Sequence, residues 1–185
     1  YGATAEGATY EDFEWIMGIN FWGVVYGTKA FLPHLRASGD GHVINTSSLF
    51  GLIGVPGQSA YNASKFAVRG FTDALRIELE MCGAPVSATC VHPGGIKTNI
   101  ARAARTSESL KDIGVRDPKN SGAFFEKMFR TTAERAAEVI LDGVRKNKAR
   151  VLVGADAIAL DALQRSLPGG YQHLLANTAK GYALG

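Results

Sequence analysis

Residues 47–65 decide the fold of this chain, and they read SSLFGLIGVPGQSAYNASK. Ser48 ends a short β-branched run that is typical of a strand, and Ser59 begins a segment with helical periodicity. Tyr61 and Lys65 stand four residues apart, so in a helix their side chains share one face. Open α/β proteins place their sites where a strand end and a helix meet across a loop, as they do here.

The segments on both sides of this stretch alternate between helix and strand patterns. A capping pair at Thr9 and Asp12 begins a long helical pattern that reaches about residue 36, and Asn20 lies on its apolar stripe. The other predicted elements are strands over 42–47, 86–91 and 150–154, and helices from Ser59 to Gly83, from Thr131 to about Lys146 and from Asp156 to about Arg165.

This alternation predicts an α/β fold with a doubly wound parallel sheet that is buried on both sides. The helix after Thr131 is expected to face the core with Ala137, Ile140, Leu141 and Val144. Three strands make a poor complete sheet, and the strand over 42–47, which should be central, becomes an exposed edge. We therefore expect one Rossmann-like domain over 1–185 whose first half is missing from the sequence.

Two loops interrupt the pattern. Gly51, Gly54 and Gly57 are spaced G-x-x-G-x-x-G, which differs from the G-x-G-x-x-G of a dinucleotide fingerprint, so we interpret them as flexible loop positions. Residues 99–130 have weak periodicity with Pro118 inside them, which indicates short helices on a mobile flap.

Composition and charge exclude several classes of function. The chain has 185 residues, 46% of them hydrophobic and 20% charged, as in an ordinary globular protein. The net charge of +3 is spread along the chain, so neither nucleic acid nor an anionic membrane is predicted as a partner. Two cysteines without metal spacing, together with the lack of a signal-peptide pattern, favour a reducing, cytoplasmic compartment and no metal site.

The physical chemistry of the Tyr61 and Lys65 pair suits proton transfer. A tyrosine has a pKa near 10, so a base that works near neutral pH needs a drop of about three units, or roughly 4 kcal/mol. An ammonium about 5 Å away at an effective dielectric near 20 favours the phenolate by about 3 kcal/mol. We expect Lys65 to supply most of this drop, and Ser48 to donate a hydrogen bond to a substrate oxygen.

The set Asn20, Ser48, Tyr61-x-x-x-Lys65 and Pro93-Gly94 with Thr98 resembles the short-chain dehydrogenase/reductase family, in this order and spacing. The resemblance extends over most of the chain. It implies an NAD(P)-dependent oxidoreductase that transfers a hydride between a secondary alcohol or ketone and nicotinamide. The family's N-terminal Gly-rich fingerprint has no match in this sequence, nor does the residue that selects the adenine ribose, so the choice between NAD and NADP stays open.

The resemblance also implies a role for each residue of the set. Tyr61 is the acid/base catalyst, Lys65 binds the nicotinamide ribose, and Asn20 holds a water that continues a proton relay. The cofactor contacts are Tyr61, Lys65, Pro93, Gly94, Ile96 and Thr98. The flap over 99–130 closes over the substrate.

Oligomerisation is also expected by resemblance, as a homodimer or homotetramer. The helices that start near Thr9 and Ser59 pack against copies of themselves, and Trp22, Tyr26, Phe66 and Phe71 are the candidate contacts on their outward faces.

Each of these residues also has a structural explanation, and two other functions stay open. Tyr61 and Lys65 alone are more often ordinary helix residues, and His92 is more often structural. The chain could be a truncated Rossmann-like interaction module without catalysis. A serine hydrolase is a weaker alternative, because Ser48 lacks the G-x-S-x-G turn.

Overall fold

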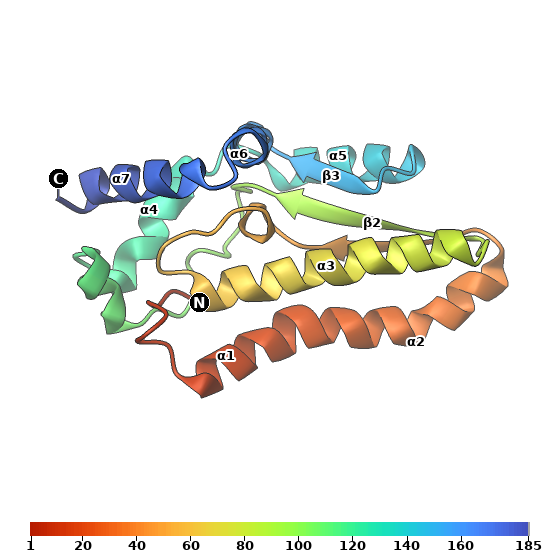
Figure 1. Ribbon diagram of the computed structural model, residues 1–185, viewed down its shortest axis with the longest axis horizontal. Coiled ribbons are helices and arrows are strands. Elements are labelled where there is room, and N and C mark those ends of the chain that lie inside the picture. Colours follow the sequence, from red (N-terminus) through yellow and green to blue (C-terminus); the bar gives the residue numbers. More distant parts are fainter. Residues whose placement is uncertain (185) are drawn as a thin grey trace.

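Three parallel strands form a sheet at the centre of the molecule (Figure 1). The computed structural model describes residues 1–184, and side chains at all of these positions except 124, 125, 127, 128 and 180–184; residue 185 of the predicted domain lies outside the described residues. The strands are β1 (Gly41–Thr46), β2 (Val86–Pro93) and β3 (Arg150–Val153), in the order β1-β2-β3. Each connection between them contains at least one helix, as parallel pairing requires.

One face of the sheet is covered by two long helical segments that run side by side (Figure 1). The first consists of α1 (Tyr10–Met17), a π-helical turn (Gly18–Trp22) and α2 (Gly23–Ser38), and the second is α3 (Ser59–Met81). The core on this face holds Val43, Leu75, Leu79, Val86 and Ala88. Leu32, Leu35 and Phe71 pack against that core. Phe71 is partly buried there and also contacts the Phe21 ring, so its side chain does not lie on an outward face of α3 as expected.

The opposite face of the sheet is covered by α5 (Ala133–Arg145) and α6 (Ala155–Ser166), followed by α7 (Gly170–Leu184). A second cluster lies there, formed by Val91, Ala136, Val151 and Val153. A third joins the loop after β1 to the last helices through Leu49, Leu52, Ile53 and Tyr171. Helices on both faces confirm the predicted doubly wound parallel sheet.

The segment between β2 and α5 consists of short helical pieces, as its weak periodicity predicts. Two 3₁₀ helices, Glu108–Ile113 and Pro118–Asn120, precede α4 (Ser121–Met128). The predicted 99–130 flap includes the four side chains in α4 that lie outside the described residues.

Of the three predicted helix caps, one is right and two are wrong by one residue. Thr9 and Asp12 form the expected capping box of α1. The cap of α3 is Gln58, and Ser59 is its first helical residue. Thr132 caps α5, because its extended backbone lets its hydroxyl accept from Arg135 N, whereas Thr131 pairs with Ile96 in a β-bridge.

The inward face of α5 also differs from the prediction. Ala136 and Gly143 are buried, whereas Ala137 and Leu141 are exposed. A Cβ on Gly143 would lie only 2.3 Å from Val151 Cγ2. Small residues therefore let α5 approach β3 closely, which rotates Leu141 away from the sheet.

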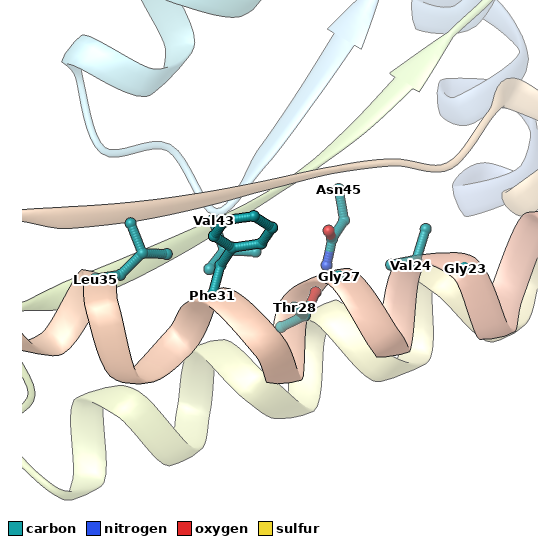
Figure 2. A pocket seen from close by; sticks show the side chains of 8 residues that line it. All are labelled: Gly23, Val24, Gly27, Thr28, Phe31, Leu35, Val43 and Asn45. Atoms are coloured by element: carbon teal, nitrogen blue, oxygen red, sulfur yellow. The ribbon is translucent and has the colours of Figure 1, made fainter.

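Among the described residues, no strand pairs with the outer edge of β1, so the expected exposed edge is confirmed. Ile44 on this strand is 42% exposed. A groove of about 220 Å³ runs between β1 and α2. Figure 2 shows Val43 and Asn45 of β1 pointing toward Thr28 and Phe31 of α2 across this groove. No helix in the described part of the chain is both long enough and apolar enough to span a membrane.

Candidate active site

Ser48 lies two residues after the end of β1, where the chain turns from strand to loop. Its backbone is extended, and its side chain caps the 3₁₀ turn Leu49–Gly51. The hydroxyl oxygen accepts a hydrogen bond from Phe50 N at 3.1 Å. The carbonyl oxygen of Ser48 accepts from the Nδ1 of His92, also at 3.1 Å. Both ends of the residue are therefore tied down at the carboxyl edge of the sheet.

Tyr61 and Lys65 share one face of α3, as their spacing predicts. The Lys65 Nζ lies 5.7 Å from the centroid of the Tyr61 ring and donates a hydrogen bond to Thr46 O at 3.0 Å. The Phe50 ring packs edge-on against Tyr61, with centroids 5.9 Å apart. Two parts of the fold, the chain after β1 and helix α3, thus bring together the hydroxyl of Ser48, the phenol and the ammonium.

The pKa of Tyr61 is shifted upward, whereas the sequence predicted a downward shift. Burial raises the pKa of the phenol above its ordinary value, and hydrogen bonding from Ser48 lowers it only in part. Burial also lowers the pKa of Lys65. The expectation that Lys65 supplies most of the drop for Tyr61 is therefore wrong for this structure, because removing both groups from water disfavours both charged forms.

Asn20 lies in the π-helical turn between α1 and α2. Its Nδ2 donates to Ser64 Oγ at 3.1 Å, and that hydroxyl donates to Tyr61 O at 2.8 Å. A π-helical turn re-aims the side chains that it carries and occurs often at functional sites. The structure thus brings Asn20 to the helix turn that carries Tyr61 and Lys65.

The predicted cofactor loop begins where β2 ends, beside the end of β1. Gly94 has no room for a side chain there, because a Cβ would lie 2.2 Å from Asp156 Oδ1. The same carboxylate accepts a hydrogen bond from Gly95 N at 2.6 Å. Asp156, at the start of α6, therefore holds this loop in place, and its distance of 61 residues from Gly95 gave no signal in the sequence.

Ile96 and Thr98 have different surroundings. Ile96 bridges to Thr131 and packs against the cluster beneath α5, so its side chain is partly buried in the core. Thr98 is exposed, and its hydroxyl oxygen accepts from Ile100 N at 3.5 Å. Of the two, only Thr98 presents its side chain to solvent.

The segment over 99–130, predicted as a flap, packs on the loop that connects Ser48 to Tyr61. A Cβ on Gly57 would lie 2.7 Å from Leu110 Cδ2 and 3.1 Å from Ile113 Cδ1, both in the 3₁₀ helix Glu108–Ile113. Residues 2 and 3 connect this loop to the segment over 99–130. Ala3 N donates to Gly57 O in the loop and Gly2 N donates to Arg105 O in the segment, each at 2.9 Å.

Sequence reasoning missed two side chains and misjudged a glycine in this region. Asn62 is 8% exposed and makes three hydrogen bonds to the loop between Ser48 and Tyr61. Ser47 Oγ donates to Lys65 O at 2.8 Å. Gly51, expected to be flexible, is buried, and its Cβ would lie 2.2 Å from Ser47 Oγ. In the sequence, the only indication of a role for Ser47 and Asn62 is that they stand next to Ser48 and Tyr61.

His92, which the sequence favoured as structural, is fully buried beneath Ser48. Its Nε2 has no hydrogen-bond partner among the residues that the structure describes. Among the described residues, no cluster of His, Cys, Asp and Glu side chains could hold a metal ion.

Comparison with known proteins gives the family and the fold of this chain. Residues 2–109 match the family described as short chain dehydrogenase. The chain is 51% identical over 177 residues to the oxidoreductase SadH of Mycobacterium tuberculosis, which covers 95% of this chain and 62% of that protein.

Two solved structures have the same fold. A short-chain dehydrogenase/reductase from Burkholderia phymatum, in complex with NAD, superposes with a TM-score of 0.78 at 22% identity, covering 90% of this chain and 62% of that one. A short chain dehydrogenase from Burkholderia cenocepacia J2315, in complex with NADP, superposes with a TM-score of 0.62 at 25% identity, covering 96% and 65%. The chain spans less than two thirds of these proteins. Because the family pattern covers more than half of the sequence, this chain belongs to the short-chain dehydrogenase family.

Proposed function

We propose that the protein is an NAD(P)-dependent oxidoreductase that transfers a hydride between a secondary alcohol or ketone and nicotinamide. The observation that carries this proposal is the convergence of Ser48, Tyr61 and Lys65 at the carboxyl edge of the sheet, with Ser48 acting on the phenol of Tyr61. Membership of the family supports it. The relatives' names, which describe oxidoreductases, agree with it.

Tyr61 is the acid/base catalyst in this proposal. In alcohol oxidation its phenolate takes the hydroxyl proton of the substrate, and in ketone reduction its phenol returns that proton to the oxygen. Ser48 donates a hydrogen bond to the same oxygen. Because Phe50 N already donates to Ser48 Oγ, the hydroxyl proton of Ser48 is free to point to the substrate or to Tyr61.

Lys65 and Asn20 complete the proton path. Lys65 is held by Thr46 O, and its ammonium hydrogen-bonds the nicotinamide ribose. Asn20, held by Ser64 one residue before Lys65, orients a water that carries protons between Lys65 and solvent.

The cofactor is NAD or NADP, which when bound supplies the hydride acceptor or donor and, when oxidised, a positive charge near Tyr61. Pro93 and Gly94 at the end of β2, the backbone at Ile96 and the exposed hydroxyl of Thr98 hold its nicotinamide end, together with Tyr61 and Lys65. Asp156 keeps the loop in the required shape. A positive charge there favours the phenolate, which offsets the burial that raises the pKa of Tyr61.

Substrate selection belongs to the flap over 99–130. Its first 3₁₀ helix packs on Gly57, inside the loop that joins Ser48 to Tyr61, so the flap lies against one wall of the site. We also propose that the protein acts in the cytoplasm as a homodimer or homotetramer.

The test uses the full-length protein, NAD⁺ or NADP⁺, and a panel of secondary alcohols, with absorbance of the reduced nicotinamide as the readout. Tyr61→Phe keeps the ring contact with Phe50 but removes the proton donor, so we expect kcat to fall by about 10²- to 10⁴-fold. Thr178→Val, far along α7, is the control and should keep full activity. Turnover that survives Tyr61→Phe unchanged would contradict the assignment.

One observation favours a second candidate, a Rossmann-like interaction module without catalysis. The free edge of β1 and the apolar groove beside it could accept an added strand from a partner (Figure 2). Quenching of intrinsic fluorescence by NADH and NADPH separates the two candidates. Saturable binding of either dinucleotide by the full-length protein supports the oxidoreductase, and no binding of either supports the module.

A further inference from the structure

Phe50 connects the two hydroxyl groups on which the proposed chemistry depends. Its N–H donates to Ser48 Oγ at 3.1 Å, and its ring packs on Tyr61 at an interplanar angle of 79°. A displacement of Phe50 therefore turns the Ser48 hydroxyl and loosens the Tyr61 ring together. A residue that fixes the Phe50 backbone therefore controls the alignment of the Ser48 hydroxyl with the Tyr61 phenol.

Asn62 holds that backbone. Its Nδ2 donates to Phe50 O and to Ile53 O, both at 2.7 Å, and its Oδ1 accepts from Val55 N at 3.1 Å. A primary amide has two donor hydrogens, and both are used here within the loop. Since the side chain is almost fully buried, a lost bond would leave a carbonyl or N–H of the loop without a partner.

Asn62 also connects these bonds to Tyr61, because the two residues are neighbours in α3. Asn62 follows Tyr61 directly in the first turns of α3, so one helix turn carries the phenol and the side chain that anchors Phe50. Two hydrogen bonds therefore connect this helix turn to Ser48: Asn62 donates to Phe50 O, and Phe50 N donates to Ser48 Oγ. They position Ser48 relative to Tyr61 in addition to the sheet.

We propose that Asn62 is a positioning residue that aligns Ser48 with Tyr61 by fixing Phe50. This inference rests on the function proposed above, but its main test needs no substrate. The three hydrogen bonds of Asn62 go to the backbone of the loop between Ser48 and Tyr61.

The test follows the ionisation of Tyr61 by NMR of ¹³Cζ-labelled tyrosine in the full-length protein, with the signal assigned by its loss in Tyr61→Phe. Ser48 lowers the pKa of Tyr61, so Ser48→Ala should raise it. Asn62→Leu keeps the side-chain volume but removes all three bonds, and should raise the pKa in the same direction. If Asn62 acts through Ser48, the double variant adds nothing to Ser48→Ala alone.

The control is Thr72→Val, which also removes a buried hydrogen-bonding group from α3 but lies away from the loop, bonded to Val68 O and Asn45. We expect it to leave the Tyr61 titration unchanged. Asn62→Ser, which can keep one of the three bonds, should give an intermediate result and replaces Asn62→Leu if that variant does not fold by circular dichroism.

Three outcomes overturn the proposal: an unchanged Tyr61 titration in folded Asn62 variants, a shift equal to that of Thr72→Val, or full additivity with Ser48→Ala. If the wild type shows no turnover but the NMR cycle behaves as expected, the proposed activity fails while the positioning role stands. If turnover is found, Asn62→Leu should lower kcat by about 100-fold and change KM little, since misplacement of reacting groups acts on the chemical step.

Discussion

At the scale of single residues, burial dominates the chemistry of the site. Tyr61, Lys65 and His92 each have a pKa displaced in the direction that disfavours the charged form, and burial is the largest cause in every case. In such a buried site, the ionisation of a side chain depends strongly on the charge of a bound ligand. A positive charge brought near Tyr61 acts in a medium that screens it weakly, so it changes the ionisation of the phenol more than it would at the surface.

His92 makes a prediction about stability and pH. Burial lowers the pKa of its ring to about 4, from an ordinary value of 6.5. Above pH 6.5 the ring is neutral in both the folded and the unfolded chain, so the stabilisation is complete. Between pH 6.5 and 4 only the unfolded chain takes up the proton, and the free energy of unfolding should fall by about 3 kcal/mol.

Urea unfolding at pH 7 and pH 4 measures this fall. His92→Asn can still donate to Ser48 O but cannot titrate, so its stability should lose about 3 kcal/mol less over the same range. His34→Asn, at an exposed position on α2, serves as the control. Equal pH dependence in the wild type and in His92→Asn would show that His92 does not contribute.

At the scale of elements, close contact between the 3₁₀ turn after Ser48 and α3 holds the site together. Ser47 Oγ bonds to the backbone of α3 at Lys65 O, and Gly51 fits beneath because it has no side chain. The turn and the helix are therefore packed backbone to backbone, and a side chain of any size at position 51 must push them apart.

Two glycine substitutions should have opposite effects. Gly51→Ala would place a Cβ 2.8 Å from Lys65 O and should destabilise the fold by about 1–3 kcal/mol. Gly70→Ala in α3 meets nothing within 4 Å and should stabilise the fold by up to about 1 kcal/mol, because Ala is the better helix former. Urea denaturation gives both values. A neutral Gly51→Ala would mean that the turn can move away from α3 at no cost.

At the scale of the whole molecule, two surfaces of the α1, α2 and α3 layer are exposed. One is the groove between β1 and α2 (Figure 2), and the other is the outer face of the helices, where Trp22, Tyr26 and Phe66 are 46%, 65% and 40% exposed. Trp22 and Tyr26 stack on each other with centroids 5.7 Å apart. Such an aromatic patch is typical of an interface between subunits.

The patch makes a prediction about assembly. Tyr26→Glu puts a charge beside Trp22 and should convert a dimer or tetramer into smaller species, measured by light scattering on a sizing column. Ile158→Glu is the matched control, since Ile158 is 56% exposed but lies on α6. A monomeric wild type, or dissociation by both variants alike, would argue against this interface.

The sequence by itself determined the alternation of helices and strands, the parallel sheet and the chemical identity of Ser48, Tyr61 and Lys65. These follow from periodicity and spacing, which are local properties of the chain. It failed at the caps of α3 and α5 and at the inward face of α5, where Gly143 and Val151 decide how two elements pack.

Only the tertiary structure decided what surrounds those groups. Asn62, Asp156 and His92 act on residues that folding brings to them, Asp156 and His92 from far along the chain. The direction of the Tyr61 pKa likewise depends on how much water the fold excludes, which no spacing of charges in the sequence reveals. Residue types set which chemistry is available at this site, and burial and long-range contacts set its ionisation and alignment.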